Sequence, residues 1–263
     1  MLAHEYAISP ERVDPGRVEW NQKNTPRLFS GLTPEATRRT RDFYSTFCDE
    51  LVEVSSPEVA EAAKLFENTF RQVNIALVNE LAQISHALGI DVRETLDAAN
   101  TKPYGFMKFS PSAGVGGHCI PVDPSYLAHL ALENGVRATF IERANEVNLE
   151  MPQYIAKRVA DDNGGSLKGK KVLVVGVAYK PNVADTRETP AEHLIEALNE
   201  MGALVTWSDS VVGSWQGKES SPLTGADVAI VVTKHDEVSE AEIMSAAPYV
   251  FDTTGKVKNA IQL

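Results

Sequence analysis

From Lys171 onward the sequence alternates between two kinds of segment, and this alternation is the strongest constraint on the fold. Short apolar runs typical of buried strands alternate with segments of helical periodicity. Strands that alternate with helices build a parallel sheet with helices on both faces. The sequence therefore predicts an α/β fold with a Rossmann-like, doubly wound domain over residues 166–263. Its predicted strands cover residues 172–175, 204–207, 227–232 and 249–252, and its predicted helices cover 190–202 and 239–247.

Residues 56–165 show only helical patterns. Ser56-Pro57-Glu58 opens a predicted helix that runs to about Leu88, where Gly89 ends it. About 33 residues at about 1.5 Å each make a rod of about 50 Å, which is typical of a helix that spans a dimer or links two lobes. We therefore predict a central, all-helical dimerisation domain. Its shorter helices are expected at 91–99, 123–134 and 138–162.

Residues 1–55 are less regular. Tyr6-Ala7-Ile8 can end a short strand, and the prolines and glycines that follow, up to Gly31, interrupt regular structure. A helix is predicted from Pro34 to Leu51, with Thr33 as its N-cap. Residues 51–54 alternate like a short strand.

The composition limits the classes of protein to which the chain can belong. With 263 residues and a formal net charge of −11, it is long enough for about two domains and lacks the basic character of nucleic-acid or anionic-membrane surfaces. Its two cysteines, Cys48 and Cys119, form neither a disulfide framework nor a metal-ligand pattern. No run of about 18 apolar residues is present, and the first residues lack the pattern of a signal peptide. These features predict a cytoplasmic protein without a metal site, a membrane span or a nucleic-acid partner.

The segment from Gly114 to Pro124 carries the clearest chemical signal. It reads Gly-Val-Gly-Gly-His-Cys-Ile-Pro-Val-Asp-Pro, so Cys119 follows a glycine-rich turn and Asp123 lies four residues later. A thiol on such bare backbone suits a nucleophile that attacks a carbonyl carbon while backbone N–H groups face the oxygen. Two simpler interpretations stay open: a buried Cys119 that only fills space, and an Asp123 that only caps the helix that follows.

Two further segments fit the same chemistry. Lys64 and Asn68 lie one turn apart on the predicted long helix and can hold the oxygen of a reacting carbinol or carbonyl, although a solvated helix face is the alternative. In the other segment a strand ends at Gly176, a loop carries Lys180 and Arg187, and a helix follows. This order is typical of a nucleotide-phosphate site at the carboxyl end of a strand. No G-x-G-x-x-G follows a strand anywhere in the chain.

Taken in order, these segments resemble the UDP-glucose/GDP-mannose dehydrogenase family, and most closely its bacterial UDP-N-acetylglucosamine and UDP-N-acetylmannosamine 6-dehydrogenases. The resemblance covers nearly the whole chain. The matching motifs are Ser9-Pro-Glu-Arg-Val-Asp-Pro-Gly16, Lys64-Leu-Phe-Glu-Asn68, Thr101-Lys-Pro-Tyr-Gly-Phe-Met107, Gly116-Gly-His-Cys-Ile-Pro-Val-Asp-Pro124 and the stretch from Val177 to Pro190.

The resemblance implies an NAD-dependent, two-step oxidation of the C6 alcohol of a UDP-sugar to the carboxylate. Cys119 would form a thiohemiacetal and then a thioester. Lys64 and Asn68 would hold the oxyanion, and Glu11 and Asp123 would handle protons and the hydrolytic water.

The same resemblance implies binding roles, a homodimer formed through the long helix, and a place in polysaccharide biosynthesis. Lys102 would reach the substrate, in one interpretation across the dimer interface. Gly117 and Arg187 would contact NAD between domains. The expected substrate-binding residues are Lys102, Tyr104, Ser110, Gly114, Gly116 and Lys180.

The chain departs from the family near both ends. The family begins with a complete NAD domain bearing G-x-G-x-x-G, well ahead of S-P-E-R, whereas this chain starts a few residues before that motif. Residues 1–55 are therefore expected to be a remnant of an NAD-binding domain, either in a piece of a longer chain or in a truncated protein. Residues 56–165 and 166–263 would be the central and UDP-binding domains. Thr254 stands where the family's D-T-R-N has arginine, and Ser208-Asp-Ser210 replaces H-D-P.

Two other functions compete with this one. The missing dinucleotide fingerprint favours a non-catalytic, dimeric UDP-sugar-binding remnant, whereas retention of all five catalytic candidates favours the enzyme. A 3-hydroxyacid dehydrogenase also uses a lysine and an asparagine four residues apart. The glycine-flanked Cys119 and the second doubly wound domain count against it.

Overall fold

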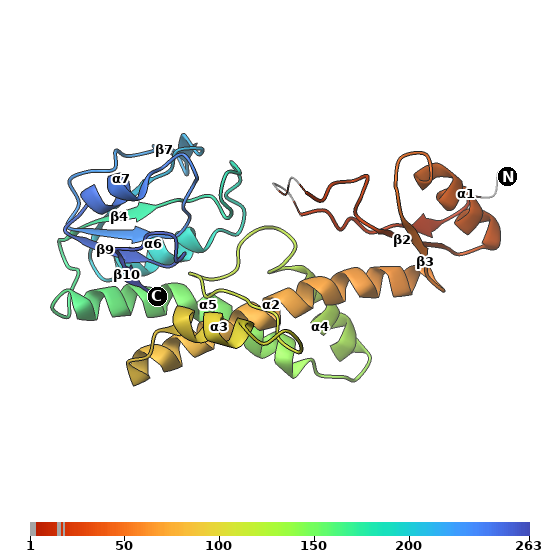
Figure 1. Cartoon of the computed structure of the whole chain (residues 1–263), viewed down its shortest axis with the longest axis horizontal. Coiled ribbons are helices and arrows are strands. Elements are labelled where there is room, and N and C mark those ends of the chain that lie inside the picture. The colour runs from red at the N-terminus through yellow and green to blue at the C-terminus, as the bar shows by residue number, and fades with distance from the viewer. Residues whose placement is uncertain (1–3, 15–16, 18) are drawn as a thin grey trace. The chain divides into compact units, whose positions relative to one another are not determined.

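The structure is a computed structural model that describes residues 4–14, 17 and 19–263. The chain divides into two compact units, Met1–Phe70 and Arg71–Leu263, and the boundary falls inside helix α2 (Pro57–Leu88). Each unit is described by itself (Figure 1). Pro15 and Gly16, the last two residues of the S-P-E-R-x-x-P-G match, lie outside the described residues.

The first unit contains a three-stranded sheet covered by one helix. Strand β2 (Arg27–Gly31) lies between β1 (Ala7–Ile8), which is antiparallel to it, and β3 (Leu51–Glu53), which is parallel to it. Helix α1 (Pro34–Tyr44) connects β2 to β3 and begins at the predicted cap, where the Thr33 side chain accepts a hydrogen bond from the amide of Ala36. The unit thus contains one βαβ connection.

Two predictions for this unit are wrong. Helix α1 ends at Tyr44, not at Leu51. The hydroxyls of Ser45 and Thr46 donate to carbonyls three residues back, and such bonds compete with the helical ladder. Strand β2 was not predicted, because Pro26 and Gly31 flank it; its residues Arg27–Ser30 are nevertheless buried.

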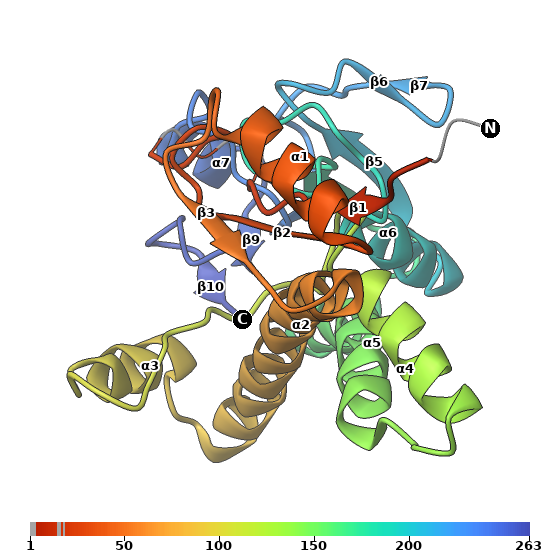
Figure 2. The ribbon, with the colours of Figure 1, turned by 90° about the vertical axis from the view of Figure 1, so that its right-hand side faces the viewer.

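The helices of the second unit follow the predicted boundaries closely. Helix α2 ends at Leu88 because Gly89 takes a left-handed conformation with φ +68°. Helices α3 (Val92–Asn100), α4 (Asp123–Glu133) and α5 (Thr139–Asp162) follow, and Figure 2 shows α4 beside α5. Val122, and not Asp123, is the residue that precedes α4. Asp123 is therefore the first residue of the helix, and the alternative interpretation of Asp123 as its N-cap is wrong.

The rest of the second unit is a five-stranded, all-parallel sheet in the order β10-β9-β8-β4-β5. Apolar residues of α5 and α6 cover one face and those of α7 cover the other, so the predicted doubly wound fold is confirmed. The elements are β4 (Lys171–Val175), α6 (Pro190–Glu200), β5 (Leu204–Ser208), β8 (Val228–Val231), α7 (Glu240–Ser245), β9 (Tyr249–Asp252) and β10 (Ile261–Gln262).

The connection from β5 to β8 contains no helix. It contains instead a small hairpin of β6 (Ser214–Trp215) and β7 (Lys218–Glu219). Residues 220–226 then cross back to the start of β8. Strand β5 therefore stays at an open end of the sheet. Among the described residues, no helix combines the length and the hydropathy that a membrane span requires.

Candidate functional site

Cys119 lies on an irregular segment that leads directly into α4. Its side chain is exposed, which excludes the interpretation of Cys119 as a buried space-filler. Its carbonyl accepts the amides of Val122 (3.3 Å) and Asp123 (2.8 Å). These two bonds make a turn between the thiol and the helix. Backbone hydrogen bonds thus hold Cys119 four residues before Asp123, which lies in the first turn of α4.

Neighbouring residues of the same unit fill the space beside the glycines that precede Cys119. A Cβ added to Gly116 would lie 2.8 Å from Cβ of Tyr179, and one added to Gly117 would lie 2.9 Å from the Tyr179 ring. The amide of Gly117 also donates to the carbonyl of Arg187 at 3.1 Å. Glycine is required here because another loop packs against the backbone. Gly117, predicted to contact NAD, therefore contacts protein, and a Cβ at Gly114 would likewise meet the carbonyl of Asn148 at 3.0 Å.

A buried amide network supports the segment that holds Ser110, Gly114 and Gly116, and the sequence interpretation missed it. The Asn79 side chain accepts the amide of Ser112 (2.9 Å) and donates to Asn148 (3.0 Å), whose own amide donates to the carbonyl of Gln72 (3.2 Å). All three amide side chains are buried. The signal in the sequence that could have revealed this network is the set of amide residues on the core side of two helices, because buried amides need hydrogen-bond partners.

The loop between β4 and α6 carries Lys180 and Arg187, as predicted. The carboxylate of Asp185 accepts a bond from Nε of Arg187 at 3.0 Å and from Nη2 at 2.5 Å, and this guanidinium lowers the pKa of Asp185. The Arg187 side chain is exposed. Its charge is therefore available at the surface, although part of its hydrogen-bonding capacity is used by Asp185.

Asp209, at the carboxyl end of β5, holds the start of that loop. Its carboxylate is buried and accepts the amides of Val177 (2.8 Å) and Ala178 (3.0 Å), and Nε2 of His235 lies 3.0 Å from its other oxygen. Burial raises the pKa of Asp209, but the His235 contact and the amide bonds outweigh burial and lower it below its ordinary value. Asp209 is thus a buried anion that neutral donors and a histidine stabilise.

In the first unit, Lys64 and Asn68 share one face of α2, as their spacing predicts. Nζ of Lys64 lies 3.5 Å from Oδ1 of Asn68. Asn68 is 9% exposed, and Lys64 is half-buried. The pair is therefore not on a fully solvated helix face.

Glu11 accepts four hydrogen bonds within the first unit. Its donors are the amides of Arg12 (2.8 Å) and Val13 (2.7 Å) and the side chains of Gln22 (2.6 Å) and Arg27 (2.9 Å). Partial burial raises the pKa of Glu11, but these bonds outweigh it and lower the pKa from 4.5 to about 2. In this arrangement the carboxylate is a poor proton acceptor and a good anchor for residues 11–27.

We expect Glu11→Gln to remove an acid-sensitive part of the stability of the first unit. A lowered folded-state pKa stabilises above the unfolded value of 4.5, and this contribution is lost as the pH falls from 4.5 towards about 2. Hydrogen exchange of the α1 amides should show the variant less stable at pH 7 by about 1 kcal/mol after allowance for solvent screening. The difference should shrink as the pH falls towards 3. Glu50→Gln, at an exposed carboxylate of the same unit, is the control. A deficit of Glu11→Gln that is equal at both pH values would contradict the prediction.

Lys102, Tyr104 and Ser110 are exposed in the second unit. Nζ of Lys102 lies 5.0 Å from the centre of the Tyr104 ring, a cation–π geometry. These side chains are accessible to a ligand.

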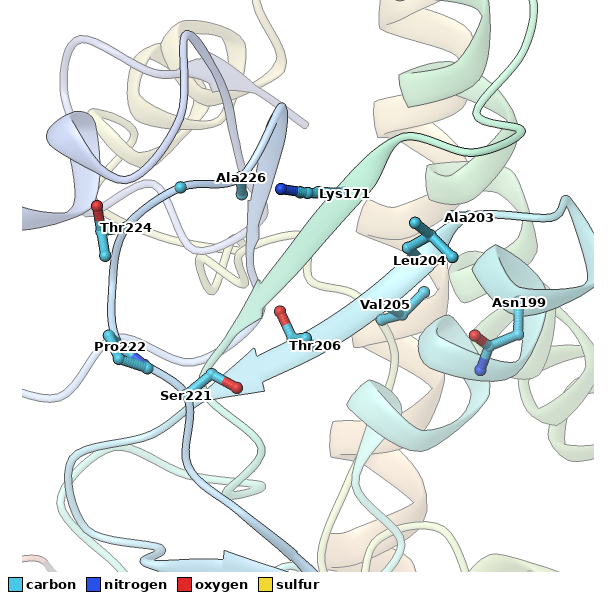
Figure 3. A pocket seen from close by; sticks show the side chains of 11 residues that line it. Lys171, Asn199, Ala203, Leu204, Val205, Thr206, Ser221, Pro222, Thr224 and Ala226 are labelled. Atoms are coloured by element: carbon cyan, nitrogen blue, oxygen red, sulfur yellow. The ribbon is translucent and has the colours of Figure 1, made fainter.

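Two cavities of the second unit lie away from Cys119. One, of about 380 Å³, opens at the carboxyl ends of β4, β5 and β8 and is lined by Gly176, Asp209 and His235 among others. The other, of about 570 Å³, follows β5, with Asn199 on one side and residues 221–226 on the other (Figure 3). Lys180 and Arg187 line neither cavity.

Comparison with known families matches two domains of one family. Residues 58–150 match the model described as "UDP-glucose/GDP-mannose dehydrogenase family, central domain", and residues 173–259 match that family's "UDP binding domain". The matched ranges correspond to the helical segment and to the parallel sheet.

Individual relatives agree with the family models. A UDP-N-acetyl-D-mannosamine dehydrogenase of Methanococcus maripaludis is 33% identical over 94% of this chain and 60% of its own length. Protein CapL of Staphylococcus aureus is 37% identical over 95% of this chain and 63% of its own. The solved structure of a UDP-D-ManNAc dehydrogenase from Pyrococcus horikoshii superposes with a TM-score of 0.83 and 29% identity, over 98% of this chain and 64% of that one.

The chain spans about 60% of the length of the curated relatives that it matches. Two models of the same family, in the order that the motifs predict, cover both the helical part and the sheet of the second unit. The chain therefore belongs to the UDP-glucose/GDP-mannose dehydrogenase family.

Proposed function

We propose that this chain carries the substrate-binding and acyl-transfer residues of a nucleotide-sugar 6-dehydrogenase. Its substrate would be a UDP-N-acetylhexosamine, with UDP-N-acetyl-D-mannosamine favoured by the names of its relatives. The observation that carries the proposal is the exposed thiol of Cys119, held by a backbone turn at the start of α4.

The proposed chemistry uses the thiol to retain the intermediate between two oxidations. The C6 alcohol first loses a hydride and a proton and becomes an aldehyde. The sulfur of Cys119 adds to the aldehyde carbon, and protonation of the oxyanion gives a thiohemiacetal. Loss of a second hydride from carbon and of the hydroxyl proton gives a thioester, which water cleaves to release the carboxylate and regenerate the thiol.

The remaining candidates take supporting roles in this proposal. Lys64 and Asn68 would stabilise the oxyanion, because an ammonium and an amide donor are both suited to negative oxygen. Asp123 would orient the hydrolytic water. Glu11 would anchor its segment and orient water, since a pKa of about 2 makes it a weak base.

NAD would supply the hydride acceptor for both oxidations. The residues described here fit it only in part. Arg187 offers an exposed cation, but the space at Gly117 is filled by the Tyr179 ring, so the glycines do not form a cradle for a pyrophosphate. We therefore infer that the cofactor needs a dinucleotide-binding segment in addition to these 263 residues, which contain no G-x-G-x-x-G after a strand.

The UDP group would bind to the second unit. The match of residues 173–259 to a UDP-binding domain supports this placement, with Lys180 as a contact to the nucleotide. At the position of the family's arginine, Thr254 makes two hydrogen bonds to Asp252, each of 2.7 Å, and contributes no positive charge. The proposed nucleotide affinity is correspondingly weaker.

A second copy of this chain is the proposed partner. Leu77, Ile84 and Leu88 are exposed on α2 at spacings of seven and four residues, which places them on one face of the helix. Such an apolar stripe is suited to an equivalent helix. The cytoplasm and polysaccharide biosynthesis belong to this proposal as the setting implied by the family.

The test is NADH absorbance when the purified chain meets NAD with UDP-N-acetyl-D-mannosamine or UDP-N-acetylglucosamine, with UDP binding measured by calorimetry in parallel. Turnover would support the enzyme without an added domain. UDP binding without turnover, restored when the nucleotide-binding domain of a relative is added, would support the proposed division of roles. UDP binding that no added domain converts into turnover would favour the alternative, a non-catalytic UDP-sugar-binding module. Absence of UDP binding would contradict both.

A further inference from the structure

The second unit contains a clamp around Asn182, a residue with no assigned role. Asn182 adopts a left-handed conformation with φ +63°, which is uncommon outside glycine. Its side chain donates to Asp236 (2.7 Å) and accepts the amide of Asp236 (3.0 Å), while its own amide donates to Nδ1 of His235 (2.8 Å). Three bonds thus tie Asn182 to the two residues that follow Lys234.

His235 lies between the clamp and Asp209. It is 2% exposed, and because Nδ1 accepts the amide of Asn182, its proton sits on Nε2, which faces Asp209 at 3.0 Å. Asp209 in turn accepts the amides of Val177 and Ala178. Both the start and the middle of the loop between β4 and α6 are therefore fastened to the carboxyl end of the sheet.

The loop between β4 and α6 also packs against the segment that carries Cys119. Tyr179 fills the space beside Gly116 and Gly117, and the carbonyl of Arg187 accepts the amide of Gly117 at 3.1 Å. A bond from the amide of Tyr179 to the carbonyl of Asp185 (2.9 Å) closes the loop between these two contacts. Gly117 is two residues from the thiol.

We propose that Asn182 is a positioning residue for Cys119. Its clamp fixes the loop that carries Tyr179 and Arg187, and this loop fixes the backbone from which the thiol projects. Asn182 touches neither substrate nor thiol in this proposal. Its link to turnover rests on the proposed function, but its effect on the Cys119 segment does not.

The test exchanges the two side chains of the clamp in the full chain. Asn182→Asp places a second carboxylate against that of Asp236, and their repulsion should release the loop. The double variant with Asp236→Asn again pairs one amide with one carboxylate, with the two groups exchanged between positions 182 and 236. Hydrogen exchange at the Gly117 amide should accelerate about ten-fold in the single variant and return towards wild type in the double variant. Exchange in α5 should not change in either.

Two further variants keep the result interpretable. Asn199→Asp adds the same charge at an exposed position of α6 and should leave Gly117 protected. If Asn182→Asp does not fold, Asn182→Gly keeps the left-handed backbone and removes only the side-chain bonds, so it should still accelerate exchange. Unchanged protection of Gly117, or acceleration that the double variant fails to reverse, would overturn the proposal.

Kinetics separate this proposal from the proposed function. In a preparation that turns over, loss of the clamp should lower kcat, because the thiol moves, and it should also raise KM for the UDP-sugar, because Lys180 lies on the released loop. Faster exchange at Gly117 in a chain that shows no turnover under any condition would leave the positioning role intact and reject the enzyme. Faster exchange with unchanged kcat would reject the positioning role.

Discussion

Replacing Cys119 with serine is expected to lower uronate formation by at least about 10³-fold. A neutral hydroxyl is a much weaker nucleophile than a thiolate near neutral pH, so the aldehyde would not be captured for the second oxidation. The measurements are the rate of uronate formation and the number of NADH molecules formed per molecule of UDP-sugar consumed. The proposed chemistry sets this number at two in the wild type.

The matched control for this variant is Cys48→Ser. Cys48 is buried in the first unit, where its thiol lies 3.5 Å from the carbonyl of Gln22, and it has no proposed part in the chemistry. Its replacement should leave the ratio of NADH to sugar unchanged. Uronate formation at more than about a tenth of the wild-type rate in Cys119→Ser would remove the covalent intermediate from the proposal.

Gly176→Ala is expected to destabilise the second unit by about 3 kcal/mol or more. Gly176 follows β4 with φ +85°, and an added Cβ would lie 2.0 Å from the carbonyl oxygen of Thr233. Both the positive φ and the steric clash disfavour alanine, and the clashing atom belongs to the backbone of Thr233, which cannot change rotamer. Thermal unfolding should show a fall of roughly 6–12 °C, given about 2–4 °C per kcal/mol for a unit of this size.

Gly217→Ala separates the two causes. Gly217 has a similar φ of +72°, but no atom lies within 4 Å of its added Cβ, so only the conformational cost applies. That variant should lose about 1 kcal/mol. Equal losses at Gly176 and Gly217 would mean that the carbonyl of Thr233 moves aside easily, which would contradict the tight junction between β4 and β8.

Local signals were sufficient for most of the fold. The sequence of helix α2 contains a start signal at Pro57 and a stop signal at Gly89, and the predicted boundaries lie within about a residue of the observed ones. The strands β4, β8 and β9 are short, mostly apolar runs between turn signals, so their type and their order along the chain followed from pattern alone. Strand β2 was missed because flanking Pro26 and Gly31 mask a buried strand whose partners lie elsewhere in the chain.

The candidate site was predictable by residue type but not by arrangement. The motifs identified Cys119, Lys180 and Arg187 as candidates, and the structure leaves the Cys119 side chain exposed and puts Lys180 and Arg187 on one loop. The packing of Tyr179 against Gly116 and Gly117 joins residues about sixty positions apart, and no periodicity reports such a contact. The glycine-rich run was therefore assigned to ligands when part of it serves protein packing.

Strand β5 is an edge strand of the parallel sheet, so it could pair with another extended chain. An end strand offers unpaired amides and carbonyls to any other extended chain, which promotes aggregation. Here the amide of Ser221 already occupies the carbonyl of Trp207 at 2.8 Å, and residues 221–226 form a wall beside the strand. The segment that replaces a helix between β5 and β8 thus covers part of this edge and limits its pairing with another extended chain.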